Sequence, residues 1–262
     1  MDLPAALAIT GAAVAAGTIN TVVGSGTLIT FPTLLALGYP PVTANVSNNI
    51  GLLFGGISGT WGYRRELAGQ GPVLRRLAPM SLIGSVAGAL ALLSLPARAF
   101  EAIVPILIVL ALGLVVAQPR IAATMARRRA ERQDSSGGAR SATHVGPVLL
   151  TGTALAGVYG GYFGAAQGVL LVGLLGSLLQ ESLQRVNAAK NLLSVIVNLV
   201  ASVTFLVVRP QAADPAVVAL IAAGSILGGV LGARIGRWLP GPVLRAVIVV
   251  VGVVAIVRLL AG

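Results

Sequence analysis

Long apolar segments separated by short polar stretches dominate the chain. They fall at about residues 5–37, 43–63, 77–95, 99–118, 146–179, 186–208, 214–235 and 241–260. Each is long enough for most or all of a membrane-spanning helix, and none alternates apolar with polar positions as an outer-membrane β-barrel strand does. The pattern therefore predicts an all-α, polytopic membrane protein, and the barrel is excluded.

The first segment of each half is too long for one straight span. Segments 5–37 and 146–179 would each form a helix about 50 Å long, whereas the hydrocarbon core is about 30 Å thick. Glycine and small polar residues interrupt both segments midway. Each segment is therefore predicted to be a helical hairpin of two short helices, a broken helix, whose tip lies at membrane depth.

The two halves share motifs in the same order. At an offset of about 140 residues, the following pairs recur: Gly17…Gly24 with Gly157…Gly164, Asn45-x-x-x-Asn49 with Asn187-x-x-x-Asn191, Gly84-Ser85-x-x-Gly88 with Gly224-Ser225-x-x-Gly228, and Leu95-Pro96 with Leu239-Pro240. Such recurrence predicts an internal repeat. The domains expected are an N-terminal repeat over 1–118, a linker over 119–145 and a C-terminal repeat over 146–262.

Charge supports an inverted arrangement of the two repeats. A hairpin that enters and leaves on one side, followed by three full spans, crosses the membrane an odd number of times. The second repeat would then be upside down relative to the first, with both termini on the outer face. This topology places these arginines together on the cytoplasmic side, as the positive-inside rule requires: Arg64, Arg65, Arg75, Arg76, Arg185, Arg234 and Arg237. A simple eight-span topology would put the last three outside.

The linker 119–145 is strongly basic and lacks an apolar period. It holds Arg120, Arg127, Arg128, Arg129, Arg132 and Arg140. We expect a mobile cytoplasmic linker of an inner-membrane protein. The formal charge of +11 would suggest nucleic-acid binding in a soluble protein, but the positive-inside rule accounts for it here, so no nucleic-acid partner is expected.

Composition narrows the chemistry further. Only 10% of the residues are charged, too few to cover a soluble globule. The absence of cysteine excludes disulfides, thiol catalysis and cysteine metal sites, and the single His144 lies in the linker. No catalytic residue, metal or cofactor is expected. Residues 1–7 lack a basic segment and a cleavage site, so we expect the start of a membrane segment and not a removable signal peptide.

The hairpin tips are candidate anion sites. Helix N-termini present free N–H groups and a partial positive charge, and interrupted helices place them near the midplane in inverted-repeat transporters. The first tip reads Gly24-Ser25-Gly26-Thr27, and the second reads Gly164-Ala165-Ala166-Gln167-Gly168 with Gln167 as its polar donor. The alternative is that these glycines only allow close helix packing.

Carboxamides cluster on the helix after each hairpin. The polar residues of these two helices are Asn45, Ser47, Asn48 and Asn49 in one and Asn187, Lys190, Asn191 and Asn198 in the other, and Asn20 lies on the first hairpin. Unpaired amides are costly in lipid, so they must face protein or water. Because they recur at equivalent positions, we favour a site lining over the alternative, hydrogen bonds that hold helices together.

Lys190 is the only lysine of the chain. Its charge could attract an anionic substrate, or its side chain could extend to the lipid headgroups. The carboxylates and the histidine all lie at loops or segment ends. Without a mid-membrane acid the chain shows no clear ion-coupling group, which favours export driven by the membrane potential, about 2.3 kcal/mol per charge at 100 mV. Coupling of transport to a sodium ion coordinated by backbone groups is the alternative.

These motifs resemble the TauE/SafE sulfite exporter family. The resemblance rests on Gly17-Thr-Ile-Asn20-Thr-Val-Val-Gly24-Ser-Gly-Thr-Leu-Ile-Thr-Phe-Pro32, on Leu37-Gly-Tyr-Pro-Pro41-x-x-Ala44-Asn45, on Gly55-Gly56 followed by Trp61-Gly-Tyr-Arg64-Arg-Glu-Leu67, and on Gly157-Val-Tyr-Gly160-Gly-Tyr-Phe-Gly164 with Asn187-Ala-Ala-Lys190-Asn191. It covers both repeats. The second tip departs from the family, whose members often keep a more glycine-rich run there.

The resemblance implies a permease that moves sulfite or a small organosulfonate such as sulfoacetate outward. The candidate substrate-binding residues are Asn20, Gly24, Ser25, Gly26, Thr27, Asn45, Asn48, Asn49, Gln167, Asn187, Lys190 and Asn191. One repeat rocking against the other would give alternating access. An anion channel, an importer and an ion-coupled carrier are the alternatives, and an intramembrane enzyme is disfavoured because no catalytic group lies in the apolar segments. The expected partners are the small anion, the lipid bilayer and, as a candidate, a second copy of the chain.

Overall fold

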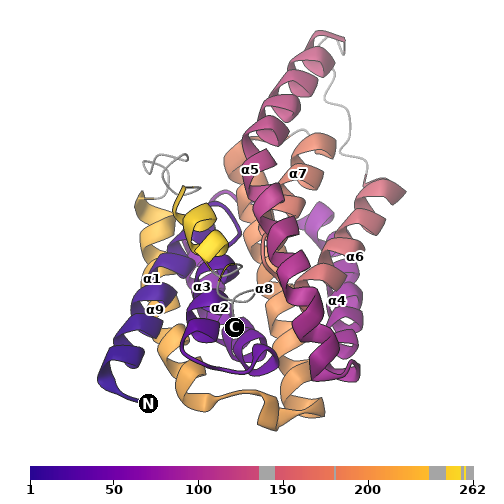
Figure 1. Cartoon of the computed structure of the whole chain (residues 1–262). Helices are drawn as coiled ribbons and strands as arrows, with labels where there is room; N and C mark the ends of the chain where they lie inside the picture. Colours follow the sequence, from indigo (N-terminus) through magenta and orange to yellow (C-terminus); the bar gives the residue numbers. More distant parts are fainter. Residues whose placement is uncertain (136–144, 180, 236–245, 255–256, 258–262) are drawn as a thin grey trace.

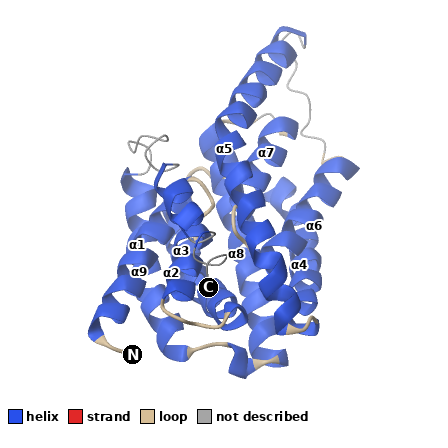
Figure 2. Ribbon diagram, in the orientation of Figure 1, coloured by secondary structure: helices blue, strands red, loops and turns tan. Residues whose placement is uncertain are grey.

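The computed structural model is all-helical across the residues that it describes, 1–135, 145–179, 181–235, 246–254 and 257 (Figures 1 and 2). The first half contains α1 (Leu3–Val22), α2 (Thr27–Ala36), α3 (Pro41–Gly62), α4 (Gly71–Ser94) and α5 (Ala97–Ser135). The second half contains α6 (Pro147–Tyr162), α7 (Gln167–Leu178), α8 (Leu183–Val208), the 3-10 helix η1 (Pro210–Ala212) and α9 (Pro215–Ile235), and residues 246–254 are also helical. The all-α polytopic fold is confirmed: α1, α4, the first 25 residues of α5, α8 and most of α9 are long and apolar enough to cross a membrane.

Both predicted hairpins are present. In the first, Gly24 turns the chain between α1 and α2 with a φ of +89°. The Tyr39 hydroxyl, just after α2, lies 3.7 Å from the Met1 sulfur, so the hairpin begins and ends at the same end of the molecule. α2 and α7 have 10 and 12 residues, too short to span a bilayer. α1 differs from the expected short arm: its 20 residues are enough for a span.

Each hairpin packs against the other half of the chain. α1 lies along α9, and its counterpart α6 lies along α4, while α3 and α8 are adjacent in the centre. Glycines make the contacts close: a Cβ on Gly228 would lie 2.1 Å from the carbonyl oxygen of Val14, and one on Gly88 would lie 2.0 Å from that of Val158. The repeat motif at 84–88 and 224–228 is therefore a packing motif, of the small-residue type that lets helix backbones approach.

The segment 119–135, the first part of the expected linker, is helical. It continues α5 as a helix, and Pro119 lies inside that helix. The reason is its local composition: alanine, arginine, glutamate and glutamine are strong helix formers, so helicity here needs no apolar face. The rest of the expected linker, 136–144, lies outside the described residues, as do Arg237 and Leu239-Pro240.

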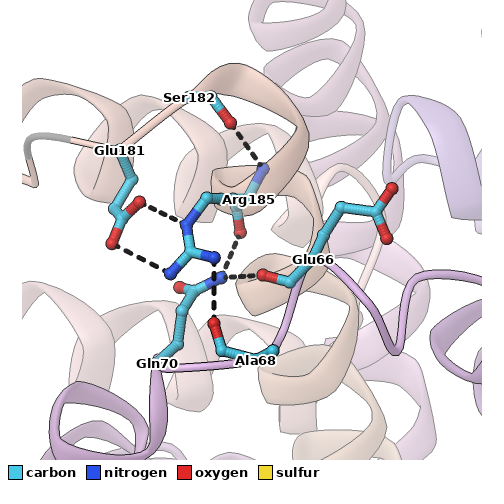
Figure 3. A network of polar contacts seen from close by, with 6 residues as sticks. All are labelled: Glu66, Ala68, Gln70, Glu181, Ser182 and Arg185. Atoms are coloured by element: carbon cyan, nitrogen blue, oxygen red, sulfur yellow. Dashed lines mark hydrogen bonds and ion pairs between the residues drawn. The ribbon is translucent and has the colours of Figure 1, made fainter.

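The loop between α3 and α4 meets the start of α8 at one end of the molecule (Figure 3). The Arg185 side chain donates to the Ala68 carbonyl at 2.9 Å, and the buried Gln70 side chain donates to the carbonyls of Arg185 and Glu66 at 3.0 and 2.8 Å. Arg185 also forms an ion pair with Glu181. Arg185 thus lies at the same end as the 64–70 loop, as the inverted arrangement requires; the side of the membrane that this end faces stays a prediction.

Candidate functional site

The two hairpin tips touch each other in the middle of the bundle. The Gly168 N–H donates to the Gly24 carbonyl oxygen at 3.1 Å. A Cβ on either glycine would lie 2.4 Å from the Cα of the other. Only glycine therefore allows this approach at the two positions. At position 24, glycine is also favoured by the positive φ.

A small cavity lies beside this contact. It is lined by Asn20, Gly24, Thr27, Asn49, Leu52, Gly164, Gln167, Gly168, Ser194 and Asn198. The centre of a water molecule can occupy about 10 Å³ of this cavity, which is room for about one water. This space is therefore smaller than a tetrahedral or pyramidal oxyanion.

The cavity is lined by uncharged hydrogen-bonding groups. Its polar side chains are four carboxamides and two hydroxyls: Asn20, Asn49, Gln167, Asn198, Thr27 and Ser194. The Gln167 side chain is 3% exposed, and its Nε2 has no hydrogen-bond partner in the described part of the chain. The Asn49 Oδ1 accepts a hydrogen bond from the Ser202 hydroxyl at 3.2 Å, which leaves its N–H groups available to a ligand.

The two hairpins supply their amides in complementary ways. In the first, the amide comes from the arm (Asn20) and the tip position is Thr27. In the second, the arm position equivalent to Asn20 is Gly160, and the tip supplies Gln167. A Cβ on Gly160 would lie 2.4 Å from Cδ of Gln167, so the glycine makes room for the longer side chain. Despite the alanines at the second tip, each hairpin thus still places one carboxamide in the cavity.

Several predicted site residues lie outside the lining and hold helices together. The Asn45 amide donates to the Tyr162 carbonyl at 3.0 Å, and the repeat-equivalent Asn187 donates to the Thr21 carbonyl at 3.1 Å. Asn191 donates to that same oxygen at 3.2 Å. These contacts match the alternative interpretation of the amides, since each joins one half of the chain to the hairpin of the other half.

Lys190 is 1% exposed, so its side chain does not extend to the lipid headgroups. Its Nζ donates to the carbonyls of Asn20 and Thr21 at 3.0 and 3.2 Å. It is not part of the cavity lining. The lysine therefore lies one layer behind the cavity, on the backbone that carries Asn20.

The remaining predicted residues belong to the first tip and its support. Ser25 is fully buried, and its hydroxyl has no partner among the described residues. A Cβ on Gly26 would lie 2.3 Å from the Ala16 carbonyl oxygen, which is a close-packing role. The Asn48 amide pairs with the hydroxyls of Thr30 and Thr27, so it positions a lining residue without lining the cavity itself.

Ser194 was not named from the sequence, and Asn198 was named in the carboxamide cluster but not in the final set of candidate substrate-binding residues. A signal for them exists in the sequence: Asn187, Asn191, Ser194 and Asn198 are spaced by four, three and four residues, the spacing of one helix face. Ser194 and Leu52 also occupy equivalent positions of the two repeats. Pattern alone could not separate the lining end of this face from the end that binds the Thr21 carbonyl.

Comparison with known proteins gives one family. The model of the family described as "Sulfite exporter TauE/SafE" matches residues 9–259. The chain is 27% identical over 250 residues to the "Probable membrane transporter protein YfcA" of Escherichia coli strain K12. The aligned residues cover 95% of this chain and 87% of that protein. It is 37% identical over 102 residues to the "Probable membrane transporter protein ORF9" of a Sinorhizobium species, covering 37% and 38% of the two chains. No solved structure matches the chain.

Proposed function

Because the chain belongs to the TauE/SafE sulfite exporter family, we propose that it exports a small sulfur-containing anion, either sulfite or an organosulfonate such as sulfoacetate. That it is a membrane transporter and not an enzyme follows from the family and from the relatives. The substrate, the outward direction and the mechanism are the proposal. Its location would be the inner membrane, with the end that carries Arg185 facing the cytoplasm.

The main support for this proposal is that the cavity holds hydrogen-bond donors that the protein itself does not use. An oxyanion has only acceptors, so it needs N–H and O–H groups that are not already used by the protein. Gln167 Nε2 is such a donor, buried and without a partner among the described residues, and Asn49 holds its own oxygen on Ser202. The start of α2 adds to this, since the N–H groups of Gly26 and Thr27 form no backbone hydrogen bond within the described part of the chain.

The small volume of the cavity supports alternating access. An anion of four heavy atoms cannot enter a space for about one water unless the tips separate. The tips come from different halves and join through the Gly168–Gly24 contact, so rocking of one half against the other would open the site. None of the described residues that line the cavity is ionisable, which supports transport driven by the membrane potential without a bound proton.

The test is uptake of radiolabelled sulfite and sulfoacetate into liposomes that contain the purified protein, with an imposed membrane potential. Uptake should saturate and should follow the potential without a proton or sodium gradient. A cation-gradient requirement would indicate a coupled carrier, and current that does not saturate would indicate a channel. If neither sulfur anion is transported, the substrate class is wrong.

A variant links this activity to the cavity. Gln167→Met should raise KM by about tenfold or more, because a hydrogen bond to a charged group contributes about 1.5–3 kcal/mol. Gln184→Met, at an exposed position of α8, is the matched control and should leave KM unchanged. Equal KM values for both variants would remove Gln167 from the site.

A further inference from the structure

A helical hairpin brings two opposed helix ends to the same place. The N-terminus of α2 carries a partial positive charge, while the C-terminus of α1, a few residues away, carries a partial negative charge. For an anion beside the first tip, the second effect offsets the first. An anion site at this tip therefore requires the C-terminal end of α1 to be neutralised.

Side chains of α8 cover that end of α1. The Ile19 carbonyl accepts from the backbone N–H groups of Val23 and Gly24. The next two carbonyls, of Asn20 and Thr21, have no such backbone donor among the described residues, and α8 supplies side-chain donors instead: Lys190 Nζ at 3.0 Å to the first, and Asn187, Lys190 and Asn191 at 3.1, 3.2 and 3.2 Å to the second. The cap thus comes from the opposite half of the chain.

One member of this cap, Lys190, is a basic residue without an acidic partner in the described part of the chain. Lys190 is buried, and no described carboxylate lies within ion-pair distance of its Nζ. Its stem packs beside Gly168, since a Cβ there would lie 2.9 Å from the lysine Cδ. The charge is therefore directed at the α1 carbonyls and lies directly behind the cavity wall formed by Asn20 and Gly168.

The second hairpin has the neutral counterpart of this arrangement. The Tyr162 carbonyl at the end of α6 receives one amide, from Asn45. The position equivalent to Lys190 is Asn48, which pairs with Thr27 and Thr30 instead. Within the described residues, the lysine cap thus belongs to the first tip alone, where the N–H groups of Gly26 and Thr27 lack backbone acceptors.

We propose that Lys190 is a positioning residue that makes the cavity selective for anions, by capping the C-terminal end of α1 with its terminal amino group and fixing the backbone of Asn20. The inference rests on the proposed anion transport. It predicts that the lysine acts through electrostatics at a distance, so its removal affects a dianion more than a monoanion.

The experiment measures KM in liposomes for sulfoacetate, a dianion, and for methanesulfonate, a monoanion of the same class. Lys190→Gln should raise KM by about tenfold for the monoanion and about a hundredfold for the dianion, because the Coulomb term doubles with the charge of the substrate. Lys190→Arg should keep the ratio of the two KM values near that of the unchanged protein.

Two further variants separate charge from packing. Asn187→Ala removes a neutral donor from the same Thr21 carbonyl and should lower thermal stability while the ratio of KM values stays constant. Lys190→Met keeps a side chain of similar length but removes the amino group, so it should change the ratio in the same direction as Lys190→Gln. That variant tests the proposal even if Lys190→Gln does not fold.

The outcomes are distinct. A changed ratio in Lys190→Gln or Lys190→Met, with an unchanged ratio in Asn187→Ala, supports the charged cap. Equal effects on both substrates, or a change in maximal rate alone, overturn it and leave the transport function intact. If the unchanged protein moves neither these sulfonates nor sulfite, the proposed function fails, and the anion-selective role of Lys190 fails with it.

Discussion

Gly24 and Gly168 determine how closely the two hairpin tips approach. Gly24→Ala would force a Cβ to within 2.4 Å of the Gly168 backbone and would also strain a φ of +89°. We expect a loss of several kcal/mol in stability, or failure to fold, because neither backbone can move away without separating the hairpins. Thermal unfolding in detergent measures this.

Gly11→Ala is the control for this prediction. Gly11 lies inside α1, and a Cβ at this position would have no described atom of another element within 4 Å, so alanine there should maintain or raise stability by up to about 1 kcal/mol. Similar melting temperatures for Gly24→Ala and Gly11→Ala would show that the tip contact is not tight.

The hydrogen bonds between the α3–α4 loop and α8 close one end of the bundle. Gln70 is 2% exposed, and it joins the carbonyls of Glu66 and Arg185 (Figure 3). Gln70→Ala leaves both carbonyls without this donor, at a cost of about 1–3 kcal/mol. We expect this end to open more often, which exposes the cavity residue Ser194 from that side.

The chain contains no cysteine, so labelling can report this opening directly. In a Ser194→Cys background, Gln70→Ala should raise the rate of reaction with a membrane-impermeant thiol reagent added on the Arg185 side of vesicles. Gln211→Ala, an exposed glutamine between α8 and α9, should not. Unchanged labelling in Gln70→Ala would mean that this contact does not close the path to the cavity.

In the molecule as a whole, the first helix of each half packs on a helix of the other half: α1 lies on α9, and α6 lies on α4. α4 begins after Gln70, at the Arg185 end, and its 24 residues carry the chain about 36 Å to the opposite end at Ser94. With the positive-inside rule, the Arg185 end should face the cytoplasm.

In intact cells, Ser94→Cys should react with an impermeant reagent, and Gln184→Cys, near Arg185, should react only after the inner face is made accessible. The reverse pattern would contradict the predicted orientation in the membrane.

The amino-acid pattern alone was sufficient for the class, the positions of most helices and the two hairpins, because span length, glycine interruptions and motif order are local properties of the chain. It did not anticipate that α5 would remain helical to Ser135, where helix propensity outweighs the lack of an apolar period.

Only the tertiary structure decided which amides line the cavity and which bind backbone carbonyls. Asn49 and Asn191 occupy equivalent positions, yet Asn49 lines the cavity and Asn191 binds the Thr21 carbonyl. For Lys190, the sequence allowed two roles, attraction of an anion and extension to the lipid headgroups. In the fold, its Nζ instead binds carbonyls at the end of α1. The physical reason is that a buried donor binds whichever acceptor the packed neighbour presents, and those acceptors are backbone carbonyls of a helix about 170 residues away in the chain.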